Sequence, residues 1–274
     1  MKIAINYADD KFRHQQAYNT KTAYTKGKVD LVIEYTPKDL DMEFKIKYNH
    51  ILSQKRGGGY WLWKPYIILK TLVNIEEGDY IIYCDSGAFY IDQVDKLIET
   101  MKKYNDSLMV FELPLIEKQW TKKETFQLMD CNKEPYLESN QILATYFVVK
   151  KSKYTVDFFY KYLNYCKDER IITDYLNKDN QNECFIDHRH DQSIFSLLCK
   201  KEGIVPYRDP SQYGDRQWEY AAYDRLIRYK KYLNSNYPRI IMSQRKANLK
   251  SFIVKEKIKD FIFKLGFIKY RGLE

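Results

Sequence analysis

The sequence predicts an α/β protein with a mainly parallel sheet flanked by helices. Short apolar runs of strand length alternate with longer amphipathic segments, which is the pattern of βαβ units. The 274 residues suffice for one large core, and neither a repeat nor a low-complexity linker divides them. We therefore expect one α/β domain over residues 1–238 and a basic helical extension over residues 239–274.

Turn-forming or polar residues bound the apolar runs that we assign to strands. The second run ends before Pro37 and the third ends at Asp85. The expected strands are 2–6, 30–35, 79–85, 107–113 and 144–150, with an edge strand at 204–205. Pro65 falls in the first turn of a helix, where its missing N–H group costs no hydrogen bond. The expected helices are 41–54, 65–77, 93–104, 121–129, 154–165, 192–199 and 220–233, with weaker helical character at 11–26.

Composition excludes several classes of protein. The chain is 45% hydrophobic and 16% aromatic with 10 Gly and 7 Pro, so it is neither disordered nor fibrous. Its five cysteines are scattered without a CxxC pair, which argues against a zinc knuckle or a disulfide framework and favours a reducing cytoplasm. The N-terminus does not read as a signal peptide, and no apolar run approaches the roughly 20 residues that span a bilayer.

The basic character of the chain belongs to its C-terminal segment. Residues 239–274 hold ten Lys and Arg against three Asp and Glu, which accounts for +7 of the net charge of +9. One helix face of this segment is apolar: Val254, Ile258, Phe261, Ile262 and Leu265. Lysines flank that face, and Gly266 is the expected stop. A basic amphipathic helix is typical of a segment that lies on an anionic membrane surface. The alternative is a helix that docks on the domain itself.

The stretch from Arg56 to Tyr90 orders a glycine loop, a helix and a buried strand, and Asp85 follows the strand. Ligands of open α/β sheets bind outside the carboxyl ends of the strands, so Asp85 and Ser86 are candidate ligand contacts. A single carboxylate is a metal ligand if other residues complete the shell, or it accepts a hydrogen bond from a ribose hydroxyl. The alternative is an aspartate that caps a turn.

The loop before that helix carries groups suited to a phosphorylated ligand. Its three glycines allow close backbone approach, and Arg56 and Lys64 are candidates to face phosphates. Trp61 and Trp63 are candidates to stack on a base or a sugar. The alternative is a turn followed by core tryptophans, and since the two cannot share one helix face we expect one of them in the core.

Two further clusters of polar residues are candidates. Residues 187–193 (DHRHDQS) open a helix with a density of titratable groups that core packing does not explain. Here Asp191 is the candidate general base, with His188 and His190 as metal or diphosphate ligands and Arg189 as a phosphate contact. The alternative for Asp191 is a helix cap. Glu138 and Asn140 precede a strand, where they would bind acceptor hydroxyls or form an ordinary loop.

Three of these motifs together resemble a known family. GGGYWLWKPYIILKTL, then GDYIIYCDSG, then HDQS at the start of a helix are similar to the GT-A-fold (Rossmann-like) glycosyltransferases of bacterial O-antigen, lipopolysaccharide and capsule gene clusters. The resemblance covers roughly residues 1–210. It implies a nucleotide-diphosphate-sugar donor, usually uridine-linked, and a lipid-linked oligosaccharide acceptor. It also implies work at the cytoplasmic face of the inner membrane, as a peripheral protein.

The family pattern assigns roles and leaves one question open. The donor side would comprise Asp85, Ser86, Arg56, Lys64, Trp63, Arg189 and His190; the acceptor side would comprise Trp61, Glu138 and Asn140. The second aspartate of the family's Asp-x-Asp is missing, so a divalent cation (Mn²⁺ or Mg²⁺) held by Asp85 and His188 is an open expectation. Galactose, as pyranose or furanose, is our guess for the sugar.

Two other functions were weighed against sugar transfer. A nucleotidyltransferase would carry a glycine-rich basic loop after the first strand, where this chain has YADDKF. A nucleic-acid-binding protein would spread its positive charge over a folded face, whereas residues 1–238 carry only +2, so we expect no nucleic-acid partner.

Overall fold

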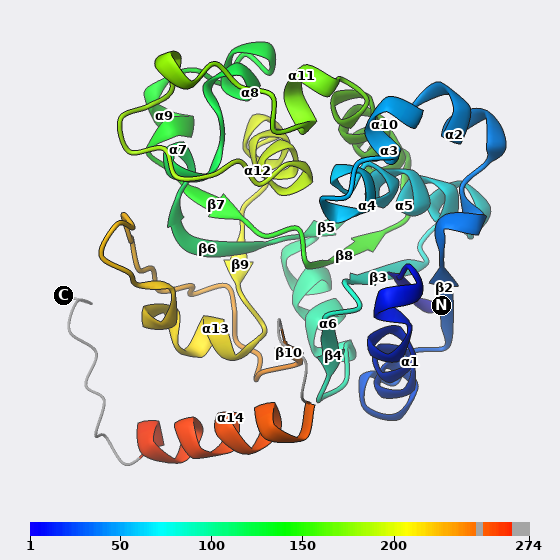
Figure 1. The fold of residues 1–274 in the computed structure, drawn as a ribbon. Coiled ribbons are helices and arrows are strands. Elements are labelled where there is room, and N and C mark those ends of the chain that lie inside the picture. The colour runs from blue at the N-terminus through cyan, green and yellow to red at the C-terminus, as the bar shows by residue number, and fades with distance from the viewer. Residues whose placement is uncertain (245–248, 265–274) are drawn as a thin grey trace.

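A computed structural model describes residues 1–244 and 249–264 (Figure 1). Its central sheet has the strand order β2-β1-β3-β8-β5. The strands are β1 (Lys2–Tyr7), β2 (Leu31–Tyr35), β3 (Tyr80–Cys84), β5 (Leu108–Met109) and β8 (Tyr146–Lys150). β1 pairs in parallel with β2 and with β3, whereas β8 runs antiparallel to both β3 and β5. The expected mainly parallel sheet is therefore confirmed, with the strand expected at 144–150 as its one reversed member.

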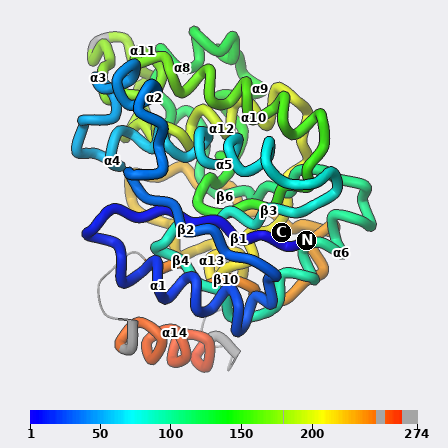
Figure 2. The backbone as a smooth tube through the Cα atoms, turned by 90° about the vertical axis from the view of Figure 1, so that its right-hand side faces the viewer, coloured from blue at the N-terminus to red at the C-terminus, as the bar shows by residue number. Residues whose placement is uncertain are grey.

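Helices cover both faces of this sheet (Figures 1 and 2). On one face lie α5 (Trp63–Asn74), α10 (Lys153–Cys166) and α12 (Asp191–Lys201); on the other lie α1 (Arg13–Thr22) and α6 (Asp95–Tyr104). The alternation along β3 explains the two cores: Ile81 and Tyr83 pack toward α5, whereas Ile82 and Cys84 pack toward α6.

Two smaller sheets extend the domain. β6 (Phe111–Ile116) pairs with β7 (Asn140–Ile142) and with β9 (Tyr207–Arg208), and β4 (Ala88–Tyr90) pairs antiparallel with β10 (Ile241–Ser243). The short helices are α2 (Met42–Lys47), α3 (Asn49–Leu52), α4 (Gly57–Tyr60), α7 (Glu117–Trp120), α8 (Lys123–Leu128), α9 (Glu134–Leu137), α11 (Glu169–Ile172) and α13 (Gln212–Asp215). Single turns of 3₁₀ or π helix are η1 (Asp10–Phe12), η2 (Ala23–Gly27), η3 (Pro37–Asp39), η4 (Lys178–Asn180) and η5 (Gln217–Tyr220).

Two predictions for the later part of the domain are wrong. Residues 220–233 form no helix beyond the last residue of η5; the Arg225 N–H closes a turn on the Ala222 carbonyl, and the segment then passes beside β6, where Ile227 bridges Leu115. The domain provides hydrogen-bond partners for its backbone at Arg228. The Arg228 N–H donates to the Pro114 carbonyl, and the Arg228 carbonyl accepts from the Asn140 side-chain amide. The edge strand expected at 204–205 lies instead at β9, three residues later.

The C-terminal helix α14 (Leu249–Lys264) lies along the lower edge of the molecule, beside α13 and β10 (Figure 1). The expected stop at Gly266 and the apolar position Leu265 lie outside the described residues. Within the ranges that the structure covers, every helix is too short or too polar to cross a bilayer.

Candidate active site

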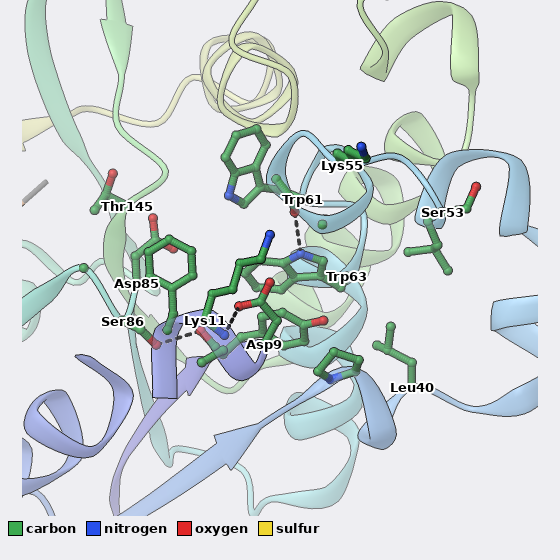
Figure 3. Close-up of a pocket in the computed structure, with 18 of the residues that line it drawn as sticks. Asp9, Lys11, Leu40, Ser53, Lys55, Trp61, Trp63, Asp85, Ser86 and Thr145 are labelled. Atoms are coloured by element: carbon green, nitrogen blue, oxygen red, sulfur yellow. Dashed lines mark hydrogen bonds between the residues drawn. The ribbon is translucent and has the colours of Figure 1, made fainter. Parts of the chain in front are cut away.

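A cavity of about 770 Å³ opens at the carboxyl ends of β1 and β3 (Figure 3). Its lining comes from four segments that are far apart in the sequence: 7–12 after β1, 37–58 before and within the glycine loop, 85–87 after β3, and 243–244 after β10, together with Trp61, Trp63 and Thr145. Asp85 and Ser86 therefore lie where the sequence placed a ligand, at the sheet edge that binds ligands in open α/β folds.

The glycine loop forms a left-handed turn that carries the tryptophans. Five consecutive residues, 57–61, have positive φ, a conformation that glycine adopts without cost and other residues rarely adopt. A Cβ atom at Gly57 would lie 2.3 Å from the Trp61 ring, and one at Gly59 would lie 2.6 Å from the Leu52 Cα. The Trp63 ring stacks on Tyr7 at 3.7 Å and donates to the Gly57 carbonyl. Trp63 is the tryptophan that joins the core, and both tryptophans also line the cavity.

Behind Asp85 lies a buried group of alternating charge. The Lys64 ammonium, only 3% exposed, is 2.6 Å from Asp191 Oδ2 and 3.5 Å from Asp85 Oδ1. It also donates to the Ala144 carbonyl at 3.1 Å, so its three N–H groups all have partners. The Tyr83 hydroxyl donates to Asp85 Oδ1 as well. Asp85 is thus held from behind by a cation and a phenol, while its carboxylate lines the cavity.

Burial sets the electrostatics of this group. Burial raises the pKa of the Asp191 carboxyl to about 6, although the neighbouring Lys64 ammonium opposes the shift. Burial would lower the pKa of Lys64, but the Asp191 and Asp85 carboxylates outweigh it and hold that pKa above its ordinary value. The Tyr162 hydroxyl adds a hydrogen bond to the Asp191 carbonyl. Asp191 and Lys64 do not line the cavity, so Asp85 is the member of this group that faces it.

The two histidines of the DHRHDQS segment are structural neighbours of the cavity wall. His188 is buried, with Nε2 at 2.8 Å from the Ile171 carbonyl and Nδ1 accepting from the Lys122 N–H. His190 Nδ1 lies 2.7 Å from the Ile172 carbonyl, and its ring stacks on Trp61 with ring centroids 5.6 Å apart. Burial lowers the pKa of both rings, for His190 to about 4. Neutral rings that are hydrogen-bonded to the backbone in this way pack behind the cavity wall and are not suited to bind a phosphate.

The two arginines expected at phosphates also have protein partners. Arg56 pairs with Asp174 at 3.0 Å and with Asp187 at 2.6 Å. The Arg189 guanidinium stacks over the Trp120 ring at 4.0 Å. Neither side chain lines the cavity.

The expected acceptor residues Glu138 and Asn140 are not in the cavity lining either. Glu138 pairs with Lys118 at 2.6 Å, and Asn140 is buried where its amide donates to the Arg228 carbonyl. Glu138 thus caps the C-terminus of α9 and Asn140 begins β7, so neither side chain faces the cavity. Of the expected acceptor group, only Trp61 reaches the cavity.

The residues that follow β1 also belong to the site, although no motif in the sequence marked them. Asp9 and Lys11 line the cavity, and Asp9 caps the η1 turn by accepting the Lys11 N–H (Figure 3). The signal was present, since these residues follow a parallel strand as Asp85 does. Lys45 and Lys55, which precede the glycine turn, carried no comparable pattern.

The residues present do not fit the divalent-cation site expected from Asp85 and His188. Both ring nitrogens of His188 are engaged with the backbone, and Asp85 Oδ1 already contacts Tyr83 and Lys64. Across residues 1–244 and 249–264, no three His, Cys, Asp or Glu side chains gather in a geometry suited to a metal ion. Hard cations in proteins need several oxygen ligands, and this chain brings few of them together at the cavity.

Comparison with known proteins defines the fold. No protein-family model matches the chain, and no curated protein matches its sequence. The galactosyltransferase LgtC, solved with donor and acceptor sugar analogues, aligns over 99% of this chain and 98% of its own, with a TM-score of 0.52 and 14% identity. An active-site mutant of LgtC gives a TM-score of 0.51 at 13% identity, over 94% of this chain and 96% of its own. Mouse xyloside xylosyltransferase 1 aligns over 91% and 99% with a TM-score of 0.45 at 9% identity.

The likeness to LgtC confirms the expected fold class. The chain has a mixed α/β fold with a mostly parallel central sheet, similar to the GT-A glycosyltransferase LgtC over nearly the full length of both proteins.

Proposed function

We propose that this protein is a glycosyltransferase that moves a sugar from a nucleotide-diphosphate donor to an acceptor hydroxyl. The observation that carries the proposal is Asp85 at the end of β3, facing a cavity of about 770 Å³ within an LgtC-like fold. Sites for ligands the size of a nucleotide typically measure about 300–1,000 Å³. Apolar and aromatic walls with a few polar groups are also typical of such sites.

In the proposed reaction the bond from the anomeric carbon to the diphosphate oxygen breaks, and a bond to the acceptor oxygen forms. The nucleoside diphosphate leaves with the electron pair, and the acceptor hydroxyl passes its proton to the departing diphosphate. We propose a uridine-linked donor, with galactose in pyranose or furanose form as the first sugar to test. The proposed acceptor is a lipid-linked glycan of bacterial surface polysaccharide synthesis.

Each residue near Asp85 has a proposed part. Asp85 accepts hydrogen bonds from donor hydroxyls, while Trp61 and Trp63 form the wall against which a ring packs. Ser86 donates to the Tyr7 carbonyl at 2.7 Å and so ties the loops after β1 and β3 together. Asp191 was expected to be the base, but it is buried behind Lys64. We therefore propose that Asp191 positions Lys64, and through it Asp85.

The orientation of α14 supports a peripheral place at a membrane. Its exposed side chains include Val254, Ile258 at 53% and Phe261 at 64% of their full exposure, together with Lys255 and Lys257. These residues form an apolar stripe with adjacent cations, which suits an anionic lipid surface.

A buried ion network holds α14 in this orientation. Arg216, 1% exposed, contacts Glu256 and Asp260 on the inner face of the helix and Glu219 on η5. Arg239 also pairs with Asp260, at 2.9 Å. The helix thus turns Glu256 and Asp260 toward the domain, with Phe252 and Ile253 half-buried, and leaves Val254, Ile258 and Phe261 exposed.

Binding and turnover of nucleotide sugars test the proposal. A thermal-shift screen of nucleoside diphosphate sugars, followed by a transfer assay, should identify one donor class that stabilises the protein. Asp85→Asn should lower donor turnover by about tenfold or more, the effect of losing one charge-assisted hydrogen bond. Asp157→Asn, an exposed aspartate on α10, is the matched control. Stabilisation by no nucleotide sugar would refute the proposal, and pyrophosphate release from a nucleoside triphosphate with a sugar phosphate would indicate a nucleotidyltransferase instead.

A further inference from the structure

We propose that Lys11, Lys45 and Lys55 form a cationic rim that binds the diphosphate of the donor in place of a divalent cation. The inference rests on the proposed function, because it names the part of that site which takes the leaving group. The three lysines line the cavity from separate segments: η1, α2 and the loop before the glycine turn.

The basic groups that the sequence pointed to already have partners within the protein. Arg56 pairs with two aspartates and Lys64 with two others. Arg189 stacks on Trp120, and His190 is a buried ring of lowered pKa. None of these four side chains reaches the cavity lining.

The glycine turn does not supply a phosphate cradle. Such cradles need free backbone N–H groups that converge on the anion. Here the N–H groups of residues 58–61 donate to the carbonyls of Lys55, Gln54, Arg56 and Gly57 respectively. The turn therefore positions the tryptophans, and the positive charge must come from side chains.

The ammonium groups of the three rim lysines have no acidic partner among the described residues. In the described part of the chain, no ion pair or side-chain hydrogen bond involves the ammonium group of Lys11, Lys45 or Lys55, so all three are available to an anion in the cavity. Figure 3 shows the Lys11 side chain extending from η1 toward Trp63 and Trp61, and Lys55 on the far side of Trp63.

The charge of the rim suits a diphosphate. A nucleoside diphosphate carries at least two negative charges on the leaving group, and three ammonium groups supply charge-assisted N–H donors for them. Within the cavity lining these cations face only two carboxylates: Asp9, which caps η1, and Asp85, which is backed by Lys64. In a site walled by aromatic rings, fixed cations stabilise developing negative charge without a metal ion.

The experiment measures UDP binding by calorimetry in excess EDTA. The variant Lys11→Ala/Lys45→Ala/Lys55→Ala is compared with Lys26→Ala/Lys102→Ala/Lys153→Ala, which removes the same charge from exposed lysines outside the cavity. We expect wild type and control to bind UDP in EDTA, and the triple rim variant to bind it about a hundredfold more weakly, at about fivefold for each lysine. Uridine should bind wild type and the rim variant equally, and inorganic pyrophosphate should compete with UDP only in proteins with an intact rim.

Three results would overturn the inference. The first is that the rim variant binds UDP as tightly as the control does. The second is that wild type loses UDP binding in EDTA and regains it with Mn²⁺. Both results would be compatible with the proposed glycosyltransferase function. The third is a rim variant with unchanged donor affinity and a raised KM for a diphosphate-linked acceptor, which would assign the rim to the acceptor. Failure of wild type to bind or turn over any nucleotide or nucleotide sugar, with or without Mn²⁺, would instead refute the proposed function itself.

Discussion

The Lys64 ammonium lies 2.6 Å from the Asp191 carboxylate, and neither side chain is more than 5% exposed. A buried ion pair contributes little net stability relative to apolar residues of the same shape, but removal of one partner leaves an uncompensated charge in the core. Here the pair has a second consequence, because the same ammonium reaches Asp85 at the cavity wall.

Replacement of Lys64 should destabilise the protein strongly. Lys64→Met leaves Asp191 buried without its cation, and we expect the free energy of unfolding to fall by about 3–5 kcal/mol. The double variant Lys64→Met/Asp191→Asn should recover part of that loss, since the two residues act as a unit. Urea denaturation of the four proteins measures the coupling. Additive effects of the two substitutions would contradict the proposed pair.

The activity of Asp191→Asn separates a positioning role from a base role. If Asp191 positions Lys64, the amide keeps a hydrogen bond to the ammonium, and we expect reduced turnover with an unchanged pH profile. A general base would leave turnover almost abolished in the variant, with the limb near pH 6 missing. Rates of transfer measured from pH 5 to pH 8 distinguish the two roles.

Stability should depend on pH through Asp191. Its pKa is raised by burial from 3.8 to about 6, so the folded state binds more protons than the unfolded state between these values. Wild type should therefore lose stability relative to Asp191→Asn as the pH rises from about 4 to about 6, by up to roughly 3 kcal/mol, and the difference should level off above that. Parallel urea titrations of both proteins give this difference. A difference that grows in the opposite direction would contradict the assigned pKa shift.

The glycine turn should tolerate no side chain at Gly59. With φ at +94° and a Cβ atom 2.6 Å from the Leu52 Cα, Gly59→Ala combines backbone strain with a clash against main chain. We expect a loss of about 2–4 kcal/mol and altered tryptophan fluorescence. Gly78→Ala is the matched control, because Gly78 has φ of +88° but nothing within 4 Å of the added atom. It should cost only about 1 kcal/mol, and equal losses at the two sites would contradict the importance of the contact.

The outward face of α14 should bind anionic vesicles. Ile258→Glu/Phe261→Glu should weaken sedimentation with vesicles of phosphatidylglycerol and phosphatidylcholine by about tenfold or more, because it places charge in the apolar stripe. The unfolding temperature should not change, since both side chains already face solvent. Val73→Glu/Leu128→Glu alters two exposed apolar residues elsewhere and should bind as wild type does. Equal binding by both variants would indicate that α14 is not the membrane contact.

The sequence alone determined the layered α/β fold, most of its strands and the position of Asp85. Those features depend on local spacing: apolar runs of strand length, helical periodicity, and the rule that ligands lie beyond strand ends. The C-terminal helix was also predicted from local spacing, because its apolar residues recur with helical periodicity. The prediction of a helix at 220–233 was wrong because this segment bonds to β6, whose residues lie about a hundred positions earlier in the chain.

Tertiary structure decided which charges are free to act. Arg56, Lys64 and the two histidines of DHRHDQS looked available in the sequence, yet each meets a partner from a distant segment. Lys11 and Lys55 looked ordinary, yet they line the cavity without a partner among the described residues. The sequence likewise predicted an amphipathic helix but not that its acidic face would turn inward to Arg216. Pairing and burial depend on contacts between residues far apart in the chain, and local spacing carries no information about them.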